Sequence, residues 1–165
     1  MDKKKHVDVE AAGPRKDYAE VLTTITEQGE CPYCADFRHP GPSFKYHTKP
    51  ILWLGTYWLV TENFAPYKGT RYQFLIPHRE HIEHVTQISP EAWAELQVAL
   101  NWICEEYKIP GGSFFMRFGD LDYNGASVRH LHAQALTGAS KKIGKFLIAP
   151  PLGYSTEEYV APPKK

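Results

Sequence analysis

Polar side chains recur at every second position in one segment of the chain, at His130, His132 and Gln134. In an extended strand, such side chains point to the same face. Two imidazoles beside a carboxamide suit nucleophilic chemistry, because a neutral imidazole is a good nucleophile near pH 7. A solvated strand face that happens to carry histidines is the alternative. The intervening residues are small or apolar and would face a core: Leu131, Ala133 and Ala135.

The segment just before this strand, residues 123–128, is small and turn-prone, and it contains Asn124, Gly125 and Ser127. Glycine lets the backbone approach a ligand closely, and consecutive N–H groups in a turn form an anion-binding concavity. A phosphate held there would lie within reach of an imidazole on the next strand. An ordinary hairpin loop is the alternative, which the Asn-Gly pair favours.

The pattern Ser-x-x-His-x-His-x-Gln, formed by Ser127, His130, His132 and Gln134, resembles the active-site strand of the histidine triad (HIT) superfamily of nucleotide hydrolases and transferases. The resemblance covers about residues 31–136. Most hydrolase branches carry a third histidine where this chain has Gln134. The glutamine variant resembles galactose-1-phosphate uridylyltransferase and the dinucleoside polyphosphate phosphorylases.

This resemblance implies that His132 attacks the α-phosphorus of a nucleotide or dinucleoside polyphosphate and forms a covalent nucleotidyl-histidine. Ser127 and neighbouring N–H groups would stabilise the charge on phosphorus, and a backbone carbonyl would accept a hydrogen bond from the second ring nitrogen of His132. Gln134 can donate to a phosphate oxygen but cannot carry a proton, which favours transfer to an acceptor such as phosphate or a sugar phosphate. Hydrolysis of the same intermediate by water, and nucleotide binding without turnover, are the alternatives.

Further nucleotide contacts follow from the same resemblance. Asn63 falls where the family contacts the ribose hydroxyls, and Phe64 is a candidate for stacking on the base or, alternatively, a core residue. The family often has an asparagine that contacts phosphate where this chain has Gly119. Three residues are candidates to replace it: Arg117, Asn124 and Arg129.

Cys31 and Cys34 have the C-x2-C spacing with which two thiolates hold one metal ion. The resemblance implies a structural zinc site completed by His81 and His130. A redox Cys-Pro-Tyr-Cys motif would need a preceding apolar strand and a following helix, and the sequence predicts neither. An unmetallated pair of core cysteines and a zinc-bearing interaction module without nucleotide binding are further alternatives. Two histidines compete with His81: His78 and His84.

The chain has 165 residues, with 19 Lys and Arg balanced by 19 Asp and Glu, which gives no indication of a nucleic-acid surface. It has no apolar run long enough to span a bilayer, and no apolar segment follows the basic N-terminus as in a secretory signal. Three cysteines, an odd number, argue against a secreted disulfide framework. We therefore expect a cytoplasmic protein, and the resemblance implies a homodimer.

We expect a flexible arm over residues 1–16, a HIT-like catalytic domain over 17–138, and a C-terminal tail over 139–165 that wraps the domain or a partner subunit. The predicted fold class is α+β: an antiparallel sheet of about five strands, with one long and one short helix on one face. The short helix spans 17–28, and the long helix begins at Ser89 and ends before Pro110. Strands are expected at 44–48, 51–54, 56–62, 71–76, 113–118 and 129–136. Residues of the long helix expected to be buried are Trp93, Leu96, Leu100, Ile103, Cys104 and Tyr107.

Overall fold

The computed structural model describes residues 6–13 and 15–157, which form an α+β domain around one antiparallel sheet. The strand order is β1-β2-β3-β5-β4. The predicted sheet of about five antiparallel strands is therefore confirmed, and the strand that begins at His132 has a hydrogen-bonded neighbour on both sides. The strands are β1 (Ile51–Leu54), β2 (Leu59–Glu62), β3 (Tyr72–Pro77), β4 (Ser113–Arg117) and β5 (His132–Thr137).

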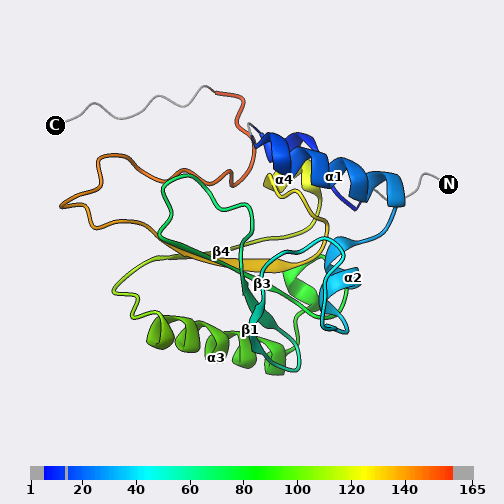
Figure 1. Cartoon of the computed structure of the whole chain (residues 1–165), viewed down its shortest axis with the longest axis horizontal. Coiled ribbons are helices and arrows are strands. Elements are labelled where there is room, and N and C mark those ends of the chain that lie inside the picture. Colours follow the sequence, from blue (N-terminus) through cyan, green and yellow to red (C-terminus); the bar gives the residue numbers. More distant parts are fainter. Residues whose placement is uncertain (1–5, 14, 158–165) are drawn as a thin grey trace.

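Helices cover both faces of the sheet, whereas the sequence predicted helices on one face. The long α3 lies on one side, and α1 and α4 lie on the other (Figure 1). The predicted short and long helices are present, and two shorter ones were missed. The helices are α1 (Lys16–Gln28), α2 (Pro32–Phe37), α3 (Pro90–Glu106) and α4 (Leu121–Asn124), with 3-10 turns at Glu10–Ala12 and Val85–Gln87.

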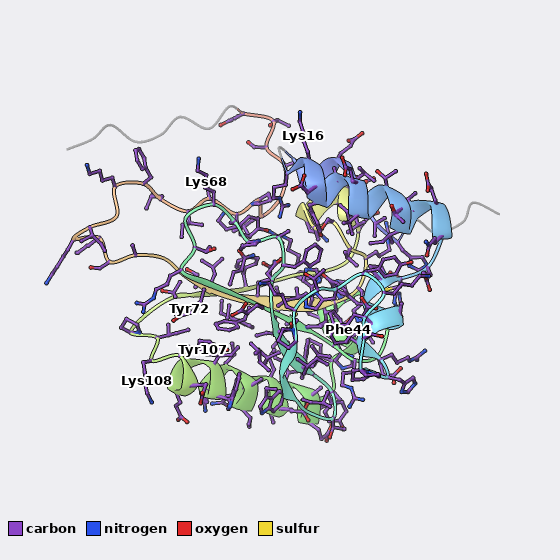
Figure 2. All side chains as sticks on the ribbon, in the orientation of Figure 1. Lys16, Phe44, Lys68, Tyr72, Tyr107 and Lys108 are labelled. Carbon is purple, nitrogen blue, oxygen red and sulfur yellow. The ribbon has the colours of Figure 1, made fainter. Side chains whose placement is uncertain are left out.

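Helix α3 begins where the sequence predicted, because the Ser89 side chain accepts a hydrogen bond from the Ala92 N–H and proline occupies the first turn. Leu96 and Ile103 are buried against the sheet, and Tyr107 at the end of the helix contacts Tyr72 with ring centroids 5.2 Å apart (Figure 2). Two residues of this helix that we expected to be buried, Trp93 and Cys104, are exposed.

The predicted strand at 44–48 does not form. The Asp36 carboxylate accepts hydrogen bonds from the N–H groups of Lys45, Tyr46 and His47, at 2.7, 3.0 and 2.8 Å. These N–H groups are therefore engaged by a side chain of α2 and are not available to a neighbouring strand. The aromatic composition of this segment instead serves packing, since Phe44 and His47 contact Phe37.

Part of the N-terminal segment that we expected to be flexible is packed against the domain. The Asp8 N–H donates to the Ser127 carbonyl at 2.9 Å, and the Arg129 N–H donates to the His6 carbonyl at 2.8 Å. Val7 between them is buried, with 1% of its surface exposed. Residues 1–5 and 14 of the predicted arm lie outside the described residues.

The C-terminal segment has no helix or strand from residue 139 to residue 157. It runs back over the domain on the side of α1 (Figure 1), where the Pro151 carbonyl accepts hydrogen bonds from the Arg117 guanidinium. Within the described residues, none of the helices is both long enough and apolar enough to cross a membrane.

Candidate functional site

The histidine-bearing strand is shorter than predicted, because β5 begins at His132 and not at residue 129. His132 and Gln134 lie on the face of β5 toward α1 and line a common pocket. Ala133 lies on the opposite face, in the core with α3. His130 belongs to the bend before the strand, and its ring contacts the two cysteines instead of this pocket. The predicted row of three is thus divided between two sites.

The His132 ring is fixed at one nitrogen. Nδ1–H donates to the His130 carbonyl at 2.8 Å, so that in the neutral ring the lone pair lies on Nε2. The carbonyl acceptor implied by the family resemblance is therefore present. Burial, with a smaller contribution from the positive charge of Arg117, lowers the pKa of His132 to about 4 against the opposing effect of this hydrogen bond. The imidazole is neutral near pH 7.

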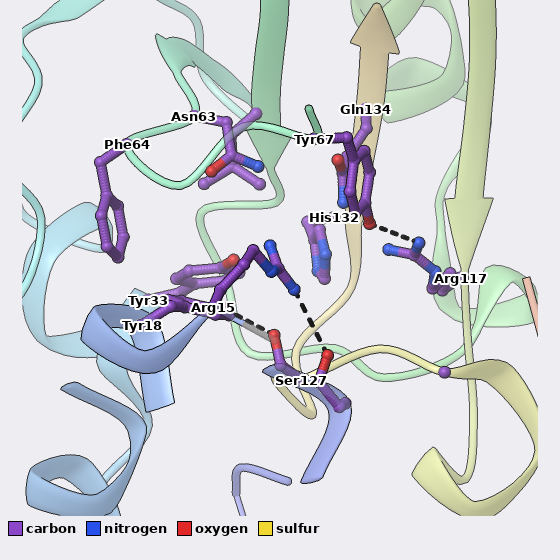
Figure 3. Close-up of a pocket in the computed structure, with 13 residues that line it drawn as sticks. Arg15, Tyr18, Tyr33, Asn63, Phe64, Tyr67, Arg117, Ser127, His132 and Gln134 are labelled. Carbon is purple, nitrogen blue, oxygen red and sulfur yellow. Dashed lines mark hydrogen bonds between the residues drawn. The ribbon is translucent and has the colours of Figure 1, made fainter. Parts of the chain in front are cut away.

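His132 opens onto a small pocket between the sheet and α1 (Figure 3). The cavity has a volume of about 20 Å³, enough for a water molecule and far too small for a nucleotide. Residues from several distant parts of the chain form its walls. They are Ala11, Arg15, Tyr18, Tyr33, Asn63, Phe64, Tyr67, Leu75, Arg117, Gly125, Ser127, His132 and Gln134.

Two polar side chains predicted from the strand motif are oriented by hydrogen bonds at the pocket. The Ser127 hydroxyl lies 2.5 Å from the Tyr18 hydroxyl. The Gln134 side-chain oxygen accepts from Gln73 Nε2 at 2.6 Å, which leaves the amide N–H groups of Gln134 as donors to a ligand. A hydroxyl and an amide donor therefore adjoin the imidazole.

Of the predicted nucleotide contacts, Asn63, Phe64 and Gly125 line the pocket, and Asn124 does not. The Asn124 side chain instead donates to the Phe118 carbonyl and accepts from the Ala126 N–H, which fixes the turn before Ser127. Of the three candidates for a phosphate contact, only Arg117 lines the pocket. Arg129, the third candidate, forms an ion pair with Asp120.

Four predicted metal ligands converge. The sulfur atoms of Cys31 and Cys34 and one nitrogen each of His81 and His130 all lie within 4.8 Å of one another. The sulfur-to-Nδ1 distances are 3.3 Å for Cys31–His130, 3.2 Å for Cys34–His81 and 3.6 Å for Cys34–His130. In tetrahedral zinc sites, Zn–S of about 2.3 Å and Zn–N of about 2.05 Å place sulfur and nitrogen about 3.6 Å apart. This donor set therefore fits zinc with only small adjustments.

Hydrogen bonds on the far side of each ring turn the lone pairs toward the cluster. His130 Nε2–H donates to the His78 carbonyl at 2.6 Å, and His81 Nε2 contacts the Glu83 carboxylate at 3.1 Å. With the proton on Nε2, each Nδ1 has a free lone pair, as in the carbonyl- or carboxylate-oriented histidines of zinc proteins. The structure excludes the competing histidine His78 from the cluster, because its Nδ1 faces the Glu80 backbone.

The remaining competitor, His84, accepts a hydrogen bond from the Thr86 N–H at the start of a 3-10 turn and does not join the cluster. Cys34 is the more acidic of the two thiols. A hydrogen bond from Cys31 holds the pKa of Cys34 far below its ordinary value, with further lowering by His130 and His81. The same bond, together with burial, raises the pKa of Cys31. The lowered pKa of Cys34 favours the thiolate, which is the form that ligates metal.

Several residues of the pocket wall, Arg15, Tyr18 and Tyr33 among them, were not predicted as site residues from the sequence, and only weak signals mark them. Arg15 and Tyr18 belong to the segment around the start of α1, which has no motif. Tyr33 lies inside the cysteine motif, where its side chain had no predicted role, and its ring meets that of His132 edge-on with centroids 5.2 Å apart. Tyr67 lies in the loop between β2 and β3.

No protein-family model and no curated protein match this chain. Among solved structures, it is similar to a HIT family hydrolase from Clostridium thermocellum, with 23% identity over 61% of this chain and 88% of the other, and a TM-score of 0.48. A histidine triad protein from Clostridium difficile has 19% identity over 62% and 88% of the two chains, with a TM-score of 0.46.

A zinc-bound histidine triad family protein from Mycobacterium smegmatis has 17% identity over 61% of this chain and 75% of the other, with a TM-score of 0.45. These solved structures carry the name of the superfamily that the strand motif resembles.

Proposed function

We propose that this chain is a HIT superfamily enzyme that acts on a nucleoside phosphoester or phosphoanhydride through a covalent nucleotidyl-histidine on His132. The observation that carries the proposal is the hydrogen bond from His132 Nδ1–H to the His130 carbonyl, because it leaves the opposite nitrogen as a nucleophile in the pocket. Ser127 and the amide of Gln134 supply hydrogen-bond donors to the phosphorus centre beside it.

The nucleoside end of the substrate has a suitable place next to this pocket. A second small cavity shares Tyr18, Tyr33 and Phe64 with the first, and its other walls include the apolar side chains of Leu22 and Ile25. An apolar, aromatic slot is suited to a base. We propose that Phe64 contacts the base and that Asn63 contacts the ribose, as the family resemblance implies.

Both cavities have a volume of about 20 Å³ each, so a nucleotide is admitted only when their common wall on α1 moves. The contacts of that wall with the rest of the site include the Tyr18–Ser127 and Arg15–Ala65 hydrogen bonds. A structure with a bound nucleoside monophosphate therefore has α1 displaced in this proposal.

Transfer to an acceptor is our proposal for the second step. Gln134 occupies the place of a third histidine and cannot accept or deliver a proton, so proton transfer to a leaving group or from water at this position is absent. An acceptor that is already anionic, such as phosphate or a sugar phosphate, needs no general base. Hydrolysis is the alternative, and it predicts free nucleoside monophosphate without any added acceptor.

The experiment is to incubate the protein with a radiolabelled dinucleoside polyphosphate, to denature it in alkali and to look for label on the chain. We expect an acid-labile adduct in the wild type and none in His132→Ala, while His84→Ala, which removes a half-buried imidazole outside the pocket, behaves as the wild type. An adduct that persists in His132→Ala would refute the assignment. Omitting and adding phosphate then separates hydrolysis from transfer.

We also propose that Cys31, Cys34, His81 and His130 hold one structural zinc ion. Four protein ligands leave no open position for water or substrate, so the ion would stabilise the domain and would not activate a nucleophile. Elemental analysis is expected to give one zinc per chain, and Cys34→Ser should abolish zinc binding.

From the family resemblance we also propose that the chain forms a homodimer, and from its composition that it is located in the cytoplasm.

A further inference from the structure

Two arginines reach into the pocket of His132 from opposite walls, Arg15 from the start of α1 and Arg117 from the end of β4 (Figure 3). Arg117 is buried, with 7% of its surface exposed, and Arg15 is half-buried. The ring of Tyr67 lies between them, with centroid distances of 5.4 Å to the Arg15 guanidinium and 5.9 Å to that of Arg117. The two charges therefore flank one aromatic wall of the pocket.

Neither arginine has an acidic partner among the described residues. Arg15 donates to three backbone carbonyls, those of Ala11, Ala12 and Ala65, at 3.0–3.3 Å. Arg117 donates to the Tyr67 hydroxyl at 2.6 Å and to the carbonyl of a residue in the C-terminal segment, Pro151, at 2.6 and 2.8 Å. Carbonyls and a hydroxyl orient these guanidinium groups without neutralising them.

Among the residues that the structure describes, no carboxylate lines the pocket, and the walls that they form carry two positive charges and no negative one. Burying an unpaired charge is costly, and proteins retain such charges mainly where a ligand supplies the counter-charge. Guanidinium groups match phosphate oxygens in geometry and in charge, since each offers paired N–H donors. The pocket is therefore complementary to an anion that carries more than one negative charge.

We propose that Arg15 and Arg117 form the binding site for the leaving phosphate of the substrate, which makes the substrate a phosphoanhydride: a nucleoside polyphosphate or dinucleoside polyphosphate. This inference rests on the proposed function and specifies its substrate class. His132 Nε2 forms the bond to the α-phosphorus, the bond from that phosphorus to the bridging oxygen breaks, and the electron pair leaves with the phosphate, whose charge the two arginines stabilise.

The arginine pair also accounts for the glutamine at position 134. A leaving group of high pKa, such as an amine or a sugar hydroxyl, must be protonated as it departs, and Gln134 cannot supply the proton. A phosphate leaves as an anion and needs charge stabilisation instead, which positively charged guanidinium groups provide. The arginine pair and Gln134 therefore favour the same leaving group, a phosphate.

The test measures kcat/KM of each variant with two substrates. One is a dinucleoside tetraphosphate, and the other is a p-nitrophenyl ester of the same nucleoside monophosphate, whose leaving group has no phosphate. In Arg15→Gln and Arg117→Gln, we expect kcat/KM for the tetraphosphate to fall by roughly 10- to 100-fold, the loss of one charge-assisted contact. For the p-nitrophenyl ester we expect a change of less than about threefold. Arg71→Gln, which removes an exposed arginine outside the pocket, is the matched control.

Equal losses on both substrates, or no loss on either, would overturn the inference. Arg117 also holds the C-terminal segment, so thermal melting accompanies each assay, and Arg15→Gln decides the question where Arg117→Gln does not fold. Binding of inorganic diphosphate to His132→Ala, measured by calorimetry, separates the two proposals. If the wild type turns over neither substrate, the proposed function has failed. Diphosphate binding that is lost in His132→Ala/Arg15→Gln would still support the anion site in that case. Diphosphate binding that persists in the double variant would refute the anion site.

Discussion

Asp36→Asn is the substitution whose effect the structure defines most fully. Asp36 lies on α2 with 4% of its surface exposed. One carboxylate oxygen accepts from the Lys45 N–H, and the other accepts from the N–H groups of Tyr46 and His47. Three backbone donors of the loop after α2 therefore depend on a single side chain.

Asparagine has nearly the same shape but only one acceptor oxygen, so its NH2 group would face one or two of these N–H donors. Each hydrogen bond to a charged acceptor contributes about 1.5–3 kcal/mol, and an unsatisfied buried donor costs a similar amount. Partial relaxation of an exposed loop reduces the total. We expect Asp36→Asn to lower the free energy of unfolding by about 2–4 kcal/mol.

The assay is urea unfolding followed by tryptophan fluorescence, with Asp17→Asn as the control. Asp17 is exposed in the first turn of α1, so its substitution should change stability by less than about 1 kcal/mol. A loss below about 1 kcal/mol in Asp36→Asn, with an unchanged urea dependence, would refute the reasoning. It would mean that the loop satisfies its donors without the carboxylate.

Three further outcomes are expected. Burial lowers the pKa of His47 to about 4, so the folded state keeps this ring neutral; its contribution to stability is complete above pH ~6.5 and is lost as the pH falls toward 4, by up to about 3 kcal/mol. Urea unfolding of His47→Gln between pH 4 and 7 should show a flatter profile than the wild type, and identical profiles would contradict the shift. Removing zinc with a chelator should lower the unfolding free energy by at least about 3 kcal/mol, seen as a fall of the melting temperature that returns on adding zinc; an unchanged melting temperature in a metal-free sample would exclude a structural role. Glu95→Gln should lower the free energy of unfolding by about 1–3 kcal/mol, because the Glu95 carboxylate accepts hydrogen bonds from three backbone N–H groups of the β1–β2 turn. These donors are the N–H groups of Thr56, Tyr57 and Trp58. An unaltered midpoint of urea unfolding would show that the turn does not need the carboxylate.

Local patterns predicted the parts of the fold that local physics decides. The Ser89-Pro90 start of α3 and the alternation of polar and small residues along β5 are determined by backbone geometry within a few residues. Two of the candidate metal ligands, Cys31 and Cys34, were predicted from a spacing that the size of a metal ion imposes, whereas His81 and His130 were predicted from the family resemblance. For α3, β5 and the two cysteines, the constraint that determines the structure lies within a few residues of sequence.

The missed features depend on contacts between distant residues. Residues 44–48 have the composition of a strand, and only the position of Asp36 nine to eleven residues earlier shows that their N–H groups are bound elsewhere. The charged N-terminal segment was expected to be flexible, but Val7 is buried beside Val128. Arg15 is separated from Ala65 by fifty residues of sequence, and no pattern within α1 indicates that its side chain lies near His132.

A single residue connects the two sites. His130 directs Nδ1 to the cysteines and donates its Nε2–H to the His78 carbonyl, while its own carbonyl accepts the hydrogen bond from His132 Nδ1. Metal bound at Nδ1 would therefore fix the backbone whose oxygen holds the proton of His132 away from the pocket. A structural ion at this cluster would act on the reaction only through the orientation and tautomer of His132, which gives a closed four-ligand site a role in catalysis without contact with the substrate.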